Sequence, residues 1–215
     1  MAKIRARAPL RLGLAGGGSD VSPFCDEHGG SVLNVTIDRY AFASIEASVD
    51  GGLSLSATDL GMVDCPTTGR DQPLDDSTGL RLHRGVINRM AKLYGEGVLP
   101  QVKLTTYVES PMGSGLGSSS ALVVAMVKAM LAYYDRSLTA YEIARLAFDI
   151  ERKDLGLRGG RQDQYAAAFG GIKTAFVQVA HCGYLNPLML QGSHHISGTH
   201  ATGAYQCNAH RLVAI

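Results

Sequence analysis

The chain has 215 residues, a formal net charge of +1 and 18% charged residues. This balance gives no reason to expect nucleic acid or a membrane surface as a partner. No run approaches eighteen apolar residues, which argues against a transmembrane helix, and the charged N-terminal stretch does not read as a secretory signal. The four cysteines (Cys25, Cys65, Cys182 and Cys207) lie far apart, so we expect reduced thiols and a cytoplasmic protein.

The first part of the chain is predicted to consist mostly of strands. Residues 3–15 read as extended, and residues 31–37 and 40–48 are β-branched or alternating runs flanked by Gly and Asp. Residues 52–59 follow an Asp-Gly-Gly turn and are expected to pair as a hairpin. Residues 60–79 are rich in turn formers and predict a surface loop.

The second part alternates between helices and strands. Apolar residues at helical spacing predict helices over 80–95 and 119–134, and Thr139 with Glu142 forms a capping-box pattern at the start of a helix over 138–156. A short helix over 163–170 and strands over 101–110 and 171–179 complete the prediction. This order of elements indicates an α+β layer structure.

Residues 111–120 read Pro-Met-Gly-Ser-Gly-Leu-Gly-Ser-Ser-Ser and lie directly before an apolar helix. The first turn of a helix has free N–H groups, and the helix dipole adds roughly half a positive charge there. Glycines let a phosphate approach the backbone, and serine hydroxyls can bind its oxygens or Mg²⁺. The loop lacks the lysine of the Walker A motif of NTPases. It also lacks the Gly-x-Ser-x-Gly pattern of the nucleophile elbow in hydrolases. The pattern predicts anion binding, and an ordinary glycine loop with a serine N-cap is the alternative.

A second glycine cluster occupies residues 9–20. A dinucleotide site would need Gly-x-Gly-x-x-Gly opening an amphipathic helix, and Pro23 with two further glycines disfavours that helix. We predict instead a loop whose backbone touches a small hydroxylated ligand, with Asp20 bonded to the hydroxyls. Arg11 would lie near transferred charge, and a solvated strand arginine is the alternative.

Asp163 follows two glycines at the start of a short predicted helix, flanked by Arg158 and Arg161. The helix dipole and these cations would hold its carboxylate ionised. The aspartate would then act as a base or orient a substrate hydroxyl, and a simple helix cap is the alternative. Glu151 lies near the C-terminus of the preceding helix, where the dipole disfavours a carboxylate, and this indicates a cation partner such as Mg²⁺ or an arginine.

In their order along residues 3 to about 176, the arginine-bearing glycine loop, the P-x-G-x-G-L-G-S-S-S loop and the G-x-x-D-Q segment resemble the GHMP kinase superfamily. Within it they are most similar to the kinases of heptose 7-phosphate. The resemblance implies an α+β N-terminal domain of the ribosomal protein S5 domain 2-like fold, with a mixed or antiparallel sheet and helices on one face. It also implies ATP and Mg²⁺ as cofactors and a small-molecule sugar phosphate as the partner.

The implied reaction is phosphorylation of the anomeric hydroxyl of D-glycero-D-manno-heptose 7-phosphate by ATP, giving the 1,7-bisphosphate. A related fucose-type sugar kinase and an inactive ATP-binding fragment are the alternatives. The resemblance assigns Asp163 and Arg11 to catalysis and Ser119 with Glu151 to the metal. It assigns the phosphates of ATP to Pro111, Gly113, Ser114, Gly115, Leu116, Gly117, Ser118, Ser119 and Ser120, and the substrate to Asp20, Gly17, Gly18, Arg158 and Arg161.

The C-terminal stretch has a different composition. All 19 Asp and Glu lie at or before Asp163, whereas five of the seven His follow it. The superfamily has a further C-terminal domain that helps to form the substrate cleft, and this stretch does not match it. We therefore expect residues 1–178 to form the ATP-binding N-terminal domain and residues 179–215 to be an atypical tail from a truncated or frame-shifted gene. A metal site of His194, His195, His200 and Cys207 is the alternative, although no nearby carboxylate would orient its ligands.

Overall fold

A single mixed sheet connects the elements of the computed structural model, which describes residues 3–48, 51–67, 69–77, 79–111, 113–178 and 211–214. Its strands run in the order β4-β3-β5-β2-β6-β7, and β1 pairs with β2 outside this path. Strands β3 and β5 are parallel, and the other pairs are antiparallel. The strands are β1 (Ile4–Ala15), β2 (Gly30–Ala47), β3 (Ser54–Ala57), β4 (Met62–Asp64), β5 (Val102–Val108), β6 (Ile172–Gln178) and β7 (Arg211–Ala214).

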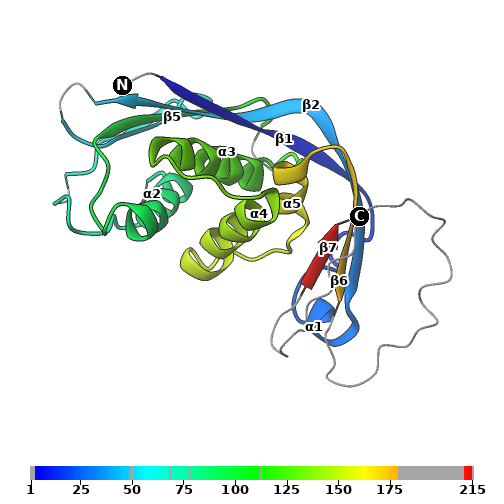
Figure 1. Cartoon of the computed structure of the whole chain (residues 1–215). Helices are drawn as coiled ribbons and strands as arrows, with labels where there is room; N and C mark the ends of the chain where they lie inside the picture. Colours follow the sequence, from blue (N-terminus) through cyan, green and yellow to red (C-terminus); the bar gives the residue numbers. More distant parts are fainter. Residues whose placement is uncertain are drawn as a thin grey trace.

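Strand β2 is the longest element and joins two parts of the sheet. Its first half pairs with β6 and its second half with β5, while β1 follows it along most of its length. Figure 1 shows β1 and β2 curving past the helices, with β6, β7 and the short helix α1 (Phe24–His28) at the far end. The two strands predicted over 31–37 and 40–48 are therefore one continuous strand.

The larger helices all lie on one face of the sheet (Figure 1). They are α2 (Arg81–Tyr94), α3 (Ser118–Tyr133), α4 (Ala140–Asp149) and α5 (Gln162–Phe169), with a π-helical turn η1 (Ile150–Asp154) after α4. The predicted α+β fold with helices on one face is confirmed. Among the described residues, no helix combines the length and apolar character that crossing a membrane requires.

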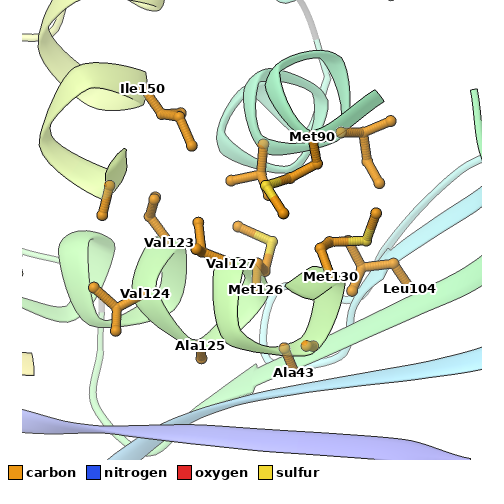
Figure 2. Close-up of a cluster of buried hydrophobic side chains, with 14 of the residues drawn as sticks. Ala43, Met90, Leu104, Val123, Val124, Ala125, Met126, Val127, Met130 and Ile150 are labelled. Atoms are coloured by element: carbon orange, nitrogen blue, oxygen red, sulfur yellow. The ribbon is translucent and has the colours of Figure 1, made fainter. Parts of the chain in front are cut away.

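Helix α3 lies at the centre of the core. It contacts β1, β2 and β5 of the sheet and also the helices α2, α4 and α5. A helix that is covered in this way can be apolar all round. Figure 2 shows Met126 and Met130 of α3 beside Met90 of α2 and Leu104 of β5. Burial of each such side chain contributes about 1.5–3 kcal/mol.

Helix α4 begins and ends for identifiable reasons. Thr139 accepts a hydrogen bond from the Glu142 N–H, and the Glu142 carboxylate accepts one from the Thr139 N–H, so the predicted capping box is present. The helix predicted over 138–156 changes to the π-helical turn at Ile150. Such turns are frequent at functional sites, and this one carries Glu151.

Two local predictions were wrong. The segment 52–59 contains β3 (Ser54–Ala57), which pairs with β4 and β5. It makes no hairpin with β2, because β5 and β1 occupy the edges of β2 at that level. The predicted loop 60–79 contains strand β4. The predicted tail lies outside the described residues except for Arg211–Ala214, which form β7 against β6, and the candidate ligands His194, His195, His200 and Cys207 also lie outside them.

Candidate active site

The glycine-rich loop leads directly into helix α3. Gly113, Gly115 and Gly117 have φ values of 77°, 74° and 69°, a region that glycine adopts without strain. Gly117 is the N-cap residue of α3 and supplies no side-chain acceptor for the first-turn N–H groups. The first turn also contains no acidic residue. These N–H groups and the positive end of the helix dipole therefore form a place where an anion is stabilised.

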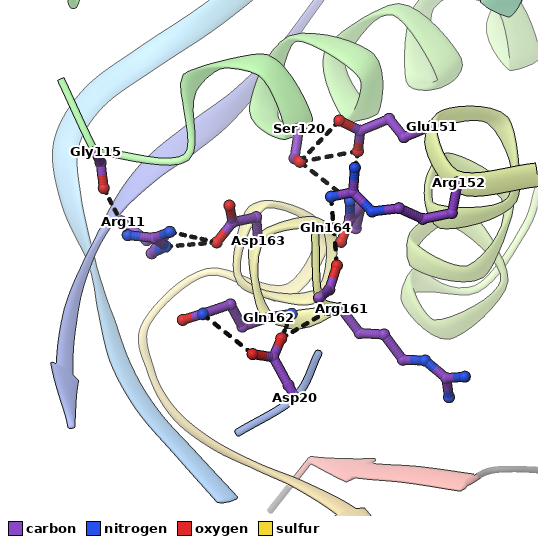
Figure 3. Close-up of polar contacts among 11 residues, drawn as sticks. Arg11, Asp20, Gly115, Ser120, Glu151, Arg152, Arg161, Gln162, Asp163 and Gln164 are labelled. Carbon is purple, nitrogen blue, oxygen red and sulfur yellow. Dashed lines mark hydrogen bonds and ion pairs between the residues drawn. The ribbon is translucent and has the colours of Figure 1, made fainter. Parts of the chain in front are cut away.

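Arg11 connects this loop to Asp163. Its Nε donates to Asp163 Oδ1 at 2.6 Å, its Nη2 lies 2.6 Å from the same oxygen, and its Nη1 donates to the Gly115 carbonyl at 2.7 Å. The Arg11 backbone N–H also donates to the Leu116 carbonyl. Figure 3 shows the guanidinium between the loop and the carboxylate. Three segments that are far apart in the sequence thus meet at one place.

A side chain at position 117 would disturb this meeting point. A Cβ atom there would lie 3.3 Å from the Asp163 carboxylate carbon and 3.4 Å from Arg11, closer than most real contacts. Asp163 and Arg11 keep 23% and 14% of their side-chain surface exposed, so a ligand can reach the pair. Glycine at position 117 therefore allows the left-handed backbone conformation and also leaves room for the ion pair.

The expected cation partners of Asp163 were wrong. Arg158 is exposed, and its carbonyl accepts from Arg152 Nη1. The Arg161 guanidinium stacks over the Phe148 ring, 4.9 Å from its centroid, and points away from Asp163 in Figure 3. The carboxylate pairs instead with Arg11, 152 residues away along the chain.

Asp20 lies in a different environment from the one predicted. Its side chain is buried, and its Oδ2 accepts hydrogen bonds from the backbone N–H groups of Arg161 and Gln162. A carboxylate held in this way does not face a ligand in the glycine loop. Gly17 and Gly18 of that loop are exposed, and their contact with a ligand stays a prediction.

The three consecutive serines after the glycine-rich loop separate into an exposed and a buried side. Ser119 is exposed, whereas Ser120 is 1% exposed and its hydroxyl contacts both carboxylate oxygens of Glu151, at 3.1 and 2.8 Å. Gln164 donates through its side-chain amide to Ser120 and to Glu151. The Ser120 hydroxyl was predicted to bind phosphate and is instead turned into the protein interior.

Glu151 is therefore a buried carboxyl group that joins α3, η1 and α5. Burial raises its pKa above the ordinary value of 4.5, and the hydrogen bonds from Gln164 and Ser120, together with the nearby Arg152 charge, oppose that rise. Figure 3 shows the three side chains pointing toward one another between the helices.

The predicted magnesium ligands do not fit a shared site in this arrangement. Glu151 is 1% exposed and both of its oxygens are engaged, whereas Ser119 faces solvent. A magnesium site that retains several waters needs ligands open to solvent, and the burial of Glu151 does not provide this. Among the described residues, no group of three or more His, Cys, Asp and Glu side chains could hold a metal ion.

Sequence reasoning assigned no role to Gln162, Gln164 and Gly160. The dipeptide Asp163-Gln164 was recognised as part of the G-x-x-D-Q segment, but Gln164 received no function of its own. Gly160 accompanies Gly159 directly before helix α5. Paired glycines before a helix are the signal that could have indicated a close approach of another group at this point.

The chain is similar to known sugar kinases. Residues 81–171 match the family described as GHMP kinases N terminal domain. The chain is 43% identical over 172 residues to D-glycero-alpha-D-manno-heptose 7-phosphate kinase of Campylobacter jejuni, covering 80% of this chain and 50% of the relative. It is 31% identical over 167 residues to galactokinase of Thermotoga petrophila, covering 78% of this chain and 44% of that protein.

Among solved structures, a D-glycero-D-manno-heptose 1-phosphate kinase from Bacteroides thetaiotaomicron has a TM-score of 0.77 and 45% identity, covering 86% of this chain and 59% of that one. The chain spans about half the length of the curated relatives it matches. The matched residues include helices α2 to α5 and the loop before α3, which are the elements that bring Asp163 and the glycine loop together. The chain therefore carries a GHMP kinase N-terminal domain.

Proposed function

We propose that this domain transfers the γ-phosphoryl group of ATP to a hydroxyl of a heptose phosphate. The observation that carries the proposal is the position of Arg11, which contacts both Asp163 and the Gly115 carbonyl. A carboxylate, a guanidinium and the open start of a helix are thereby gathered at one place. Phosphoryl transfer depends mainly on such positioning and charge neutralisation. Identities of 43% and 45% to two heptose phosphate kinases support the sugar class.

In the proposed complex the triphosphate of ATP lies on the loop of residues 111–119 and on the first turn of α3. The backbone N–H groups there and the hydroxyls of Ser118 and Ser119 would bind its oxygens. Arg11 would neutralise charge on the transferred group. Mg²⁺ belongs to the proposal as a partner of the nucleotide phosphates, since Glu151 is buried away from the loop surface.

Asp163 would receive the acceptor hydroxyl. The hydroxyl oxygen forms a bond to the γ-phosphorus, the bond from that phosphorus to the β,γ-bridging oxygen breaks, and ADP leaves. Both contacts of Arg11 go to Oδ1, so Oδ2 is the oxygen that we assign to the hydroxyl proton. Proton transfer of this kind contributes about 10²–10⁴-fold to the rate.

The acceptor that we propose is the anomeric hydroxyl of D-glycero-D-manno-heptose 7-phosphate, with the 1,7-bisphosphate as the product. Gly17 and Gly18 offer exposed backbone to the sugar, and exposed Arg158 offers a cation to its phosphate. Arg161 would join Arg158 only by leaving the Phe148 ring. Because ATP and sugar phosphates are cytoplasmic metabolites, we propose that the protein acts in the cytoplasm.

A coupled assay of ADP release tests the proposal. The full chain is incubated with ATP, Mg²⁺ and heptose 7-phosphate, heptose 1-phosphate, fucose or no acceptor. The two heptose phosphates are both included because the names of the relatives differ in the position of the phosphate. We expect ADP release to depend on heptose 7-phosphate and to fall about 10²–10⁴-fold in Asp163→Asn. Asp149→Asn is the matched control, because Asp149 pairs with Lys153 on the helix surface.

Each other outcome has a definite meaning. Equal turnover in Asp163→Asn would remove the assigned role of that carboxylate. Turnover of fucose without need of a phosphate would favour the fucose-type alternative. No ADP release with any acceptor, together with ATP binding in calorimetry, would replace the kinase proposal by an ATP-binding fragment.

A further inference from the structure

Asp20 is a buried carboxylate whose hydrogen bonds all go to one short segment. It is 3% exposed, and its Oδ2 accepts from the backbone N–H groups of Arg161 at 2.7 Å and Gln162 at 2.9 Å. The side-chain amide of Gln162 lies 3.4 Å from Oδ1. A carboxylate that accepts two backbone N–H groups is held firmly in place.

Helix α5 has no cap from its own sequence. Its N-cap residue Arg161 makes no side-chain cap hydrogen bond. Asp20, 141 residues before Arg161, accepts from the N–H groups of the N-cap residue Arg161 and of Gln162, the first helical residue, which have no partner within the helix. A local N-cap side chain would instead accept from the N–H of the second or third helical residue. The negative charge also lies at the positive end of the helix dipole. Asp20 therefore fulfils the physical role of an N-cap from a distant loop.

Gly160 gives an independent indication of the same contact. A Cβ atom at this position would lie 2.0 Å from Asp20 Oδ2 and 2.3 Å from its carboxylate carbon, a separation that no real structure allows. Gly160 is not among the glycines with positive φ, so backbone conformation does not require glycine here. The space needed by the Asp20 carboxylate is what requires it.

The segment before α5 is held from its other side as well. Arg152 donates to the carbonyls of Leu157, Arg158 and Gly160. Arg152 thus binds the carbonyl groups of the segment while Asp20 binds its N–H groups. The start of α5 is consequently fixed with respect to both η1 and the glycine loop after β1.

Asp163 directly follows Gln162, whose N–H group Asp20 binds. Arg11, the ion-pair partner of Asp163, lies on β1, and this strand leads into the loop that carries Asp20. We propose that Asp20 is a positioning residue, which caps helix α5 and thereby holds Asp163 against Arg11, and that it does not contact the substrate. This inference rests on the proposed role of Asp163. Because Asp20 is only 3% exposed, its carboxylate offers almost no surface to a sugar hydroxyl.

The test uses Asp20→Ala, Asp20→Asn and Gly160→Ala in the full chain. Asn is as good a cap as Asp, whereas Ala cannot accept a hydrogen bond. Gly160→Ala keeps the Asp20 carboxylate but displaces it, so this variant tests the same contact without changing Asp20. Asp75→Ala is the control, because Asp75 caps only the exposed turn to Ser77.

The first measurement is independent of turnover and follows amide hydrogen exchange at Arg161 and Gln162 by NMR, together with the Arg11 Nε–H signal. In Asp20→Ala and Gly160→Ala we expect exchange to accelerate about 2- to 30-fold, the range that loss of an N-cap predicts. The Arg11 signal should shift or broaden as its partner moves. Asp20→Asn and Asp75→Ala should resemble the wild type. Unchanged exchange in both Asp20→Ala and Gly160→Ala would overturn the proposal.

The second measurement separates positioning from substrate binding. Displacement of a catalytic group by about 1 Å can lower the rate about 10²-fold. We expect Asp20→Ala and Gly160→Ala to lower kcat to that extent, with the KM for heptose phosphate and the Kd for ATP within about threefold of wild type. A raised KM with unchanged kcat in Asp20→Ala would identify a substrate ligand and contradict the proposal. Absence of turnover in the wild type, with the NMR changes present, would count against the kinase function and not against the cap.

Discussion

The core beneath the sheet and the site at the start of α3 are held by different kinds of contact. In the core, side chains such as Met126 and Leu104 are fully buried and entirely apolar. At the site, Arg11 and Asp163 are partly exposed and meet through directed contacts of 2.6 Å. Apolar burial depends on area and tolerates small shifts, whereas a hydrogen-bonded ion pair depends on position. Substitutions should therefore affect stability in the core and turnover at the site.

Leu104→Ala should give the largest loss of stability. Leu104 is 0% exposed between the sheet and α3, so its truncation leaves a cavity and should lower the free energy of unfolding by about 2–5 kcal/mol. Denaturant unfolding measures this change. Lys103→Ala on the same strand is the control, because Lys103 is exposed. Equal effects of the two variants would mean that the core does not follow the proposed packing.

Arg11→Met should affect turnover and leave stability nearly unchanged, the opposite of Leu104→Ala. The variant keeps the length of the side chain but removes the cation beside Asp163, so turnover should fall about 10²–10³-fold with little change in unfolding. Steady-state kinetics and thermal unfolding of the same samples separate the two effects. Arg7→Met is the control, because Arg7 stacks over the Tyr40 ring. A large loss of stability in Arg11→Met would show that the ion pair belongs to the structural core.

Glu151 lies between these two regions and should give the smallest effects. Glu151→Ala leaves the Ser120 hydroxyl and the Gln164 amide without their buried partner, which costs about 1–3 kcal/mol of stability. Glu151→Gln preserves the shape and should retain turnover within a few-fold. A complete loss of turnover in Glu151→Gln would instead support the predicted metal role.

The pH dependence gives a second readout for Glu151. Burial raises its pKa in the native state, so the native state binds this proton more tightly than the unfolded chain does. The stability that this proton contributes is lost as pH rises above 4.5 through the raised native pKa. Glu151→Gln cannot lose that proton, so its stability relative to wild type should increase over the same rise in pH. Denaturant unfolding of both proteins across a pH series measures this difference in stability. Equal changes of the unfolding free energy with pH in the two proteins would contradict a raised pKa for Glu151.

Much of the fold follows from local patterns. The capping box at Thr139 and Glu142 correctly predicted the start of α4, and the apolar run after residue 118 correctly predicted the buried helix α3. The pairing of β3 was missed, because its choice of β5 depends on which edge of the sheet is free and no local signal encodes that. The strand β2 was divided at the polar pair Asp38-Arg39, where its register with β1 shifts between Pro9 opposite Tyr40 and Arg11 opposite Thr36, yet the strand continues through this irregularity.

The sequence by itself determined that a glycine loop precedes an apolar helix and that Asp163 begins another one, because backbone conformation and helix capping depend on neighbouring residues. Only the tertiary structure decided that Arg11 and not Arg158 or Arg161 pairs with Asp163. It also decided which serine is buried. Successive helical residues differ by about 100° around the axis, so the seating of α3 on the sheet turns Ser120 inward to Glu151 and leaves Ser119 exposed. Contacts of this kind join residues that local propensities cannot relate.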